Sequence, residues 1–211
     1  MTAEMGIFET MFNCRAMRRL SDQPVPQAQL VKLIEAAEQA ASGSNSQRRR
    51  WIIVRDPAQK AKLAELNRAV SEDYVSARIE RGEALPHHDR ESRKRMLQAV
   101  LWLARNMQRI HALIIACYEF DAPPTEQDRA RAHSSVYPGV QNLLLAARAL
   151  GLGAVLTTYA LNRYEDFVAA LELPSNFAAY ALIPVGYPLG KFGPVTRLAV
   201  EQVMRFDKWS I

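Results

Sequence analysis

Apolar residues along this chain occur either in short continuous runs or at every third or fourth position. The most apolar stretch is 137–158 (YPGVQNLLLAARALGLGAVLTT), and within 140–150 only three positions are polar. This pattern predicts a helix over 140–150, buried on more than one side, with Pro138 in its first turn and Gly151 at its end. Residues 153–158 predict a strand that enters the core. A central core helix and a helix shared by two subunits fit this pattern equally well.

The same patterns predict the other elements of the chain. Residues 71–95 are charged and contain no strand pattern, so we expect them to cross the surface or to form a cover. Residues 193–209 lack a strong core pattern but include Phe206 and Trp209. These large aromatic side chains need a surface to pack against, and a partner subunit is a reasonable candidate. Apolar periodicity predicts helices over 6–13, 27–41, 57–69, 96–107 and 161–171, and apolar runs predict strands over 50–54, 112–117 and 180–185.

Composition indicates one folded domain over residues 1–211. The chain is 49% hydrophobic and 23% charged, and no linker rich in Gly, Ser or Pro divides it. No apolar run reaches the ~18 residues that a membrane span needs, because Arg148 interrupts the longest candidate. The first residues include Glu4 and Glu9 and do not resemble a signal peptide. We therefore predict a cytoplasmic protein with no membrane partner.

Candidate chemistry is sparse. Cys14 and Cys117 are too few for a thiolate metal site, and the four histidines lack metal-ligand spacing, so we predict no metal. No catalytic triad or carboxylate pair is evident. The net charge of +5 raises nucleic acid as a partner. However, the arginines form two short clusters, Arg15/Arg18/Arg19 and 48–50, which suit one small anion such as a cofactor phosphate, and we predict no nucleic acid.

The loop 42–47 (SGSNSQ) consists of small residues, hydroxyls and carboxamides. Gly43 would let the backbone approach a ligand closely, while Asn45 and Gln47 can each donate to and accept from a flat heterocycle. An ordinary turn between a helix and a strand explains the same residues and is the simpler interpretation.

Four separated segments together resemble the FMN-dependent nitroreductase family. Their order and spacing match that family from about residue 12 to 209. The segments are 15–26 (RAMRRLSDQPVP), the loop 42–47, the stretch 137–158, and 185–197 (VGYPLGKFGPVTR).

The resemblance implies an α+β fold, a mostly antiparallel sheet flanked by helices, in an intertwined homodimer with FMN at its interface. It implies that 71–110 is a variable helical excursion and that the tail 193–211 reaches the partner subunit. The implied cofactor-binding residues are Arg15, Ala16, Met17, Arg18 and Arg197 around the FMN phosphate and ribityl chain, Thr157 and Thr158 facing the flavin, and Ser42, Asn45 and Gln47 near the flavin edge from the opposite subunit.

This chain departs from the family pattern at three places. Ala16 stands where a phosphate-binding serine is common, which removes one hydrogen-bond donor. Cys14 stands where an arginine or threonine is common. Arg48-Arg49 replaces a frequent Pro-Trp pair and alters the loop expected to shape substrate preference.

The activity implied is an NAD(P)H-dependent FMN oxidoreductase. It would pass hydride to nitroaromatic, quinone or activated-alkene acceptors by a ping-pong mechanism, with no catalytic side chain because FMN carries the chemistry. The alternatives are a specialised flavin enzyme of the same fold, such as a flavin-destroying synthase, a reductive dehalogenase or an azoline oxidase, and a non-catalytic protein that binds or stores flavin.

Overall fold

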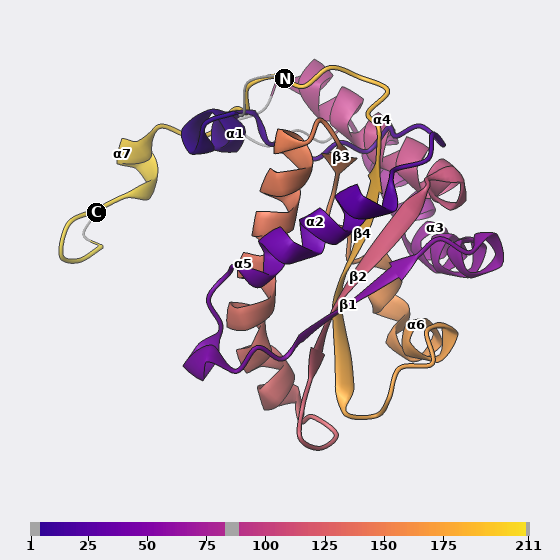
Figure 1. The fold of residues 1–211 in the computed structure, drawn as a ribbon. Helices are drawn as coiled ribbons and strands as arrows, with labels where there is room; N and C mark the ends of the chain where they lie inside the picture. The colour runs from indigo at the N-terminus through magenta and orange to yellow at the C-terminus, as the bar shows by residue number, and fades with distance from the viewer. Residues whose placement is uncertain (1–4, 83–88, 210–211) are drawn as a thin grey trace.

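A four-stranded antiparallel sheet lies between two layers of helices in the computed structural model, which describes residues 5–82 and 89–209 (Figure 1). The strand order is β1-β2-β4-β3, and every neighbouring pair is antiparallel. This arrangement confirms the predicted fold class. The strands are β1 Arg49–Val54, β2 Ala112–Glu119, β3 Gly153–Ala154 and β4 Phe177–Gly186.

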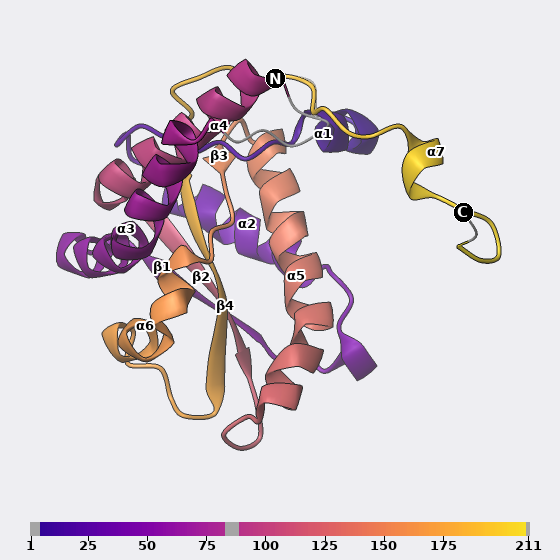
Figure 2. The same ribbon diagram turned by 180° about the vertical axis from the view of Figure 1, so that it is seen from behind.

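Helices α2 and α5 cover one face of the sheet, and α3, α4 and α6 cover the other, as the view from behind shows (Figure 2). Helix α1 and the tail that carries α7 extend away from this body in both views. The helices are α1 Ile7–Asn13, α2 Gln27–Glu38, α3 Pro57–Glu80, α4 Arg90–Asn106, α5 Glu126–Ala149, α6 Tyr164–Ala170 and α7 Val200–Val203, with 3-10 turns η1 Gly43–Asn45, η2 Met107–Arg109 and η3 Tyr159–Arg163.

Strand β2 shows why the sheet supports two cores. Its alternate residues from Ala112 to Ala116 pack under α2 and α5, and those from Leu113 to Cys117 pack under the opposite helical layer. A strand buried on both faces has no polar face, so its sequence is a continuous apolar run. The prediction of a buried strand over 112–117 is confirmed.

Helix α5 is much longer than the predicted helix over 140–150. It begins at a capping box, in which the Asp128 N–H donates to Thr125 Oγ1 and the Thr125 N–H donates to Asp128 Oδ2. Pro138 therefore lies inside the helix and not in its first turn. Sequence periodicity missed the first half because Val136 is its only large buried residue among those that the structure describes there, and the other buried positions, Ala132 and Ser135, are small.

Other predicted boundaries were also wrong. Helix α4 begins at Arg90 and not at residue 96, so part of the segment 71–95 is helical. Helix α3 continues beyond residue 69 because Ser71 and Val75 are buried on its inner face. The strand predicted over 153–158 pairs only at Gly153–Ala154 and at an isolated bridge from Thr157. The helix predicted over 161–171 is divided between η3 and α6.

Residues 83–88 of the predicted variable segment 71–110 lie outside the described residues. Among the helices that the structure does describe, none is long and apolar enough to cross a membrane. Within 5–82 and 89–209, no cluster of His, Cys, Asp and Glu could hold a metal ion.

Candidate functional site

The basic segment after α1 is held in place by two other parts of the chain. The Met17 N–H donates to Ala154 O of β3 at 3.1 Å, and the Leu189 N–H donates to Arg19 O at 2.9 Å. A Cβ added at Gly153 would lie 2.5 Å from a methyl carbon of Leu20 and 2.9 Å from Met17 Cβ, so glycine lets the segment approach β3 this closely. This segment, residues 14–20, which we call the arm, is thus fixed between β3 and the chain after β4.

Beside this arm lies a cavity of about 240 Å³. It brings together Arg18, Thr157 and Thr158, which lie in two distant segments and which the family resemblance implies as cofactor-binding residues. We call it the Arg18 cavity. Its lining is Arg18, Asn67, Val100, Leu103, Val155, Leu156, Thr157, Thr158 and Tyr159.

Arg18 supplies the cavity with an uncompensated positive charge. Its side chain is half-buried, and burial lowers the pKa of its guanidinium, an effect that the nearby charge of Arg15 reinforces and Tyr159 opposes. Within 5–82 and 89–209, no carboxylate forms an ion pair with Arg18. A cation held out of water beside a second cation is stabilised by a bound anion.

The two threonines of the Arg18 cavity differ in what they can offer a ligand. Thr157 is buried, its backbone pairs with Leu182, and its hydroxyl donates to Asn67 Oδ1 at 3.1 Å. Thr158 is exposed and free to contact a ligand. Asn67 was missed by sequence reasoning, although a carboxamide on the apolar stripe that continues from Leu63 of α3 was a usable signal.

Arg197 lies near the start of the same arm. Burial raises the pKa of the Cys14 thiol, and the positive charges of Arg148 and Arg197 oppose that rise, which places both guanidinium groups within electrostatic range of Cys14. The Arg197 side chain is exposed, and its Nη1 donates to Thr196 O. Arg15 and Ala16 are exposed as well, whereas Met17 is buried against β3.

The loop 42–47 is strained. Ser44, Asn45 and Gln47 adopt positive φ angles of 51°, 51° and 50°, a region that residues with a Cβ seldom occupy. The Gln47 N–H donates to Ser42 Oγ, and the Gly43 N–H donates to Oγ of a serine on α5. Strain of this kind persists where the surrounding contacts impose it and is common at ligand sites.

Within one chain, this loop and the Arg18 cavity are far apart. The loop is attached to α5 at Ser135, whereas the arm is attached to it at Leu144 O, the acceptor of the Cys14 thiol. These positions are nine residues apart, about 13 Å along the helix. In Figure 1 the purple loop that precedes β1 lies beside the lower part of α5, whereas β3 lies near its upper end. The structure therefore does not bring Ser42, Asn45 and Gln47 to the other candidate residues of the same subunit.

We predicted that both arginine clusters suit a small anion. The structure contradicts this for the cluster 48–50. Arg48 pairs with Asp121 at 2.8 Å, and Arg50 pairs with Glu119 at 2.5 Å. Arg49 is only 3% exposed and is enclosed by protein groups. Because acidic side chains and backbone carbonyls already satisfy these guanidinium groups, the cluster has a structural role.

The fold and the Arg18 cavity define an α+β protein with a half-buried cationic pocket beside the edge of an antiparallel sheet. The profile of the Nitroreductase family matches residues 13–187, and the chain belongs to that family. The enzyme class and the FMN cofactor that the resemblance implied are confirmed at the level of the family.

Individual relatives agree with this assignment. An NADH dehydrogenase of Thermus thermophilus is 32% identical over 194 residues, which cover 90% of each chain. An iodotyrosine deiodinase of Thermotoga neapolitana is 26% identical over 82% of this chain and 84% of that protein. The crystal structure of an oxidized iodotyrosine deiodinase bound to FMN and 3-iodo-L-tyrosine matches 97% of this chain and 100% of its own, with a TM-score of 0.73 at 22% identity.

Proposed function

We propose that this protein is an NAD(P)H-dependent oxidoreductase that binds FMN in the Arg18 cavity. The observation that carries the proposal is the half-buried Arg18 guanidinium, which has no described carboxylate partner. A phosphate group would neutralise Arg18 and Arg15 together, and Arg197 would add a third cation from the tail. Arginine binds phosphate through paired charge-assisted hydrogen bonds worth roughly 1.5–3 kcal/mol each.

Bound FMN would supply the redox chemistry, accepting hydride from NAD(P)H and passing it to an acceptor. The protein's part is binding and positioning. Thr157 holds the lining in place through Asn67 and its pairing with β4. The exposed Thr158 would offer its hydroxyl to the cofactor. Met17 positions the arm, because its N–H is committed to Ala154 O and its side chain is buried.

We infer that the active protein is a homodimer. The apolar side chains of α1 and the tail face solvent, and Figure 1 shows both segments extending away from the body, so a second copy would cover them. The same arrangement would bring the partner's strained loop 42–47 to the Arg18 cavity, where Ser42, Asn45 and Gln47 would contact the flavin edge. The exposed side chains are Ile7, Phe8, Met11, Phe12, Leu198, Val200, Val203, Met204, Phe206 and Trp209.

The dimer can be tested by replacing Phe206, which is 81% exposed in the single chain, with Asp. The control is Lys208→Asp in the same tail. We expect sedimentation to show a dimer for wild type and Lys208→Asp and a weakened dimer for Phe206→Asp. An interface of this kind should exceed ~2,000 Å². A folded, flavin-loaded wild-type monomer at micromolar concentration would contradict this inference.

The proposed acceptors are nitroaromatics, quinones and activated alkenes. Reductive dehalogenation is a second candidate, favoured by the iodotyrosine deiodinases among the relatives. Comparing turnover of a nitroaromatic, a quinone and a halogenated phenol under the same conditions would rank these acceptor classes.

The cofactor proposal is tested with the visible spectrum of the purified protein. We expect a yellow protein that loses its flavin absorbance when NADH or NADPH is added without oxygen. Arg18→Gln should weaken FMN binding about 10–150-fold, whereas Arg19→Gln, which changes the neighbouring exposed cation, should not. A colourless protein that takes up no FMN would refute the proposal. A flavin reduced by dithionite but by neither nucleotide would indicate a storage protein or a specialised enzyme.

A further inference from the structure

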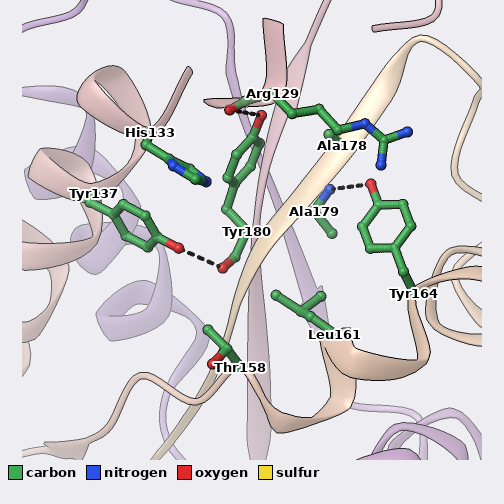
Figure 3. Close-up of a pocket in the computed structure, with 9 residues that line it drawn as sticks. All are labelled: Arg129, His133, Tyr137, Thr158, Leu161, Tyr164, Ala178, Ala179 and Tyr180. Carbon is green, nitrogen blue, oxygen red and sulfur yellow. Dashed lines mark hydrogen bonds between the residues drawn. The ribbon is translucent and has the colours of Figure 1, made fainter. Parts of the chain in front are cut away.

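A second cavity, drawn in Figure 3, shares only Thr158 with the lining of the Arg18 cavity. It is about 160 Å³ in volume and lies between the first half of α5, the η3–α6 segment and the start of β4. Three tyrosines, Tyr137, Tyr164 and Tyr180, form its aromatic walls, and Figure 3 shows them around a common space.

Hydrogen bonds fix the three tyrosine rings. The Tyr137 hydroxyl donates to Tyr180 O at 3.2 Å, and the Tyr180 hydroxyl donates to Arg129 O at 3.0 Å. The Tyr164 hydroxyl accepts from the Ala179 N–H at 3.3 Å, which leaves its own proton available as a donor. The walls are therefore preorganised, and a ligand would not have to order them.

Two nitrogen-bearing side chains complete the cavity. The Arg129 guanidinium carbon lies 4.8 Å from the centre of the Tyr164 ring. The His133 ring lies edge-on to Tyr180, with centroids 5.2 Å apart. Among the residues that the structure describes, no carboxylate pairs with either side chain. The cavity thus combines aromatic walls with a surplus of hydrogen-bond donors and positive charge.

We propose that this cavity binds a small aromatic carboxylate. A volume of about 160 Å³ is close to the ~150 Å³ that accommodates one benzene ring. The ring of the ligand would pack against the tyrosines, and its carboxylate would accept paired hydrogen bonds from the Arg129 guanidinium, with His133 as a further donor. A neutral ring would leave Arg129 unpaired, and an ion without a ring would leave the tyrosines uncovered.

Calorimetric titration of the purified protein with benzoate tests this site, and it does not depend on the flavin reaction. We expect saturable binding that Arg129→Gln weakens about 10–150-fold. The matched control is Arg131→Gln, an exposed arginine on the same helix that does not line the cavity and whose loss should leave binding unchanged. Benzamide and inorganic phosphate should each bind at least tenfold more weakly than benzoate.

Three outcomes would overturn the proposal. They are no benzoate binding at millimolar concentration, equal binding by wild type and Arg129→Gln, and equal binding of benzoate and phosphate. Melting curves of both variants show whether either has lost its fold, and Tyr164→Phe provides a second variant that removes one donor and retains the ring. Because Tyr164→Phe keeps the apolar wall, it should weaken benzoate binding less than Arg129→Gln does.

Discussion

Replacing Arg49 tests how much one buried guanidinium group contributes to the stability of this protein. Its guanidinium makes five hydrogen bonds, to Glu38 Oε1 and to the carbonyl oxygens of Glu38, Ala40, Ala41 and Ser135, at 2.7–3.3 Å. The charge is 3% exposed and joins the end of α2 and the start of β1 to α5. Gly139 makes room for it, because a Cβ there would lie 3.0 Å from Arg49 Cδ.

We expect Arg49→Met to lower the free energy of unfolding by ~3–5 kcal/mol. Most of this cost comes from the four backbone carbonyl oxygens that would lose their donor together, because the Glu38 side chain is 34% exposed and still accepts from Trp51 Nε1 at 2.7 Å. For a chain of this size, the melting temperature should fall by roughly 6–20 °C. Arg49→Lys should recover only part of the loss, since an ammonium cannot reproduce the planar fork.

The matched control is Arg50→Met, one residue along the strand. Arg50 is 46% exposed on its side chain and pairs with the partly exposed Glu119, so its removal should cost at most ~1 kcal/mol. Both variants would be compared with wild type by urea unfolding and far-UV circular dichroism at one protein concentration and saturating FMN. An Arg49→Met protein within 1 kcal/mol of wild type would refute the assigned role.

Three further predictions concern the arm, the pH dependence and the kinetics. Gly153→Ala should lower the free energy of unfolding by ~1–3 kcal/mol and weaken FMN binding, because its new methyl group would collide with Leu20. Thermal unfolding and flavin titration measure the two effects. The control Gly190→Ala, where no atom lies within 4 Å of the added Cβ, should be neutral. Burial holds the pKa of His111 below its usual 6.5, so the unfolded chain binds more protons below that pH and stability should fall as the pH drops through this range. Urea unfolding across pH 5–8 should show a smaller fall for His111→Gln, and an identical profile would contradict the assignment. Steady-state turnover with NAD(P)H and an acceptor should give parallel double-reciprocal lines, since both substrates would use the flavin in turn; intersecting lines would indicate that both bind together.

The family, the fold class and most of the sheet could be predicted from the amino-acid sequence. The run ALIIAC at 112–117 is apolar at every position because β2 is buried on both faces. Gly151 ended the central helix as predicted, and it has the positive φ of 74° that such an end requires. These features depend on local periodicity and local backbone conformation, which a sequence displays directly.

The partners of the arginine side chains, in contrast, became known only from the folded chain. Arg18 and Arg49 belong to similar basic clusters, yet one faces a cavity without a carboxylate and the other is enclosed by carbonyl groups, including that of Ser135, 86 residues away in the chain. The hydrogen bond from Thr157 to Asn67, 90 residues away in the chain, likewise could not be predicted from periodicity. A local pattern reports whether a side chain is buried, whereas the partners that satisfy its charge and hydrogen bonds come from distant segments that only folding brings together.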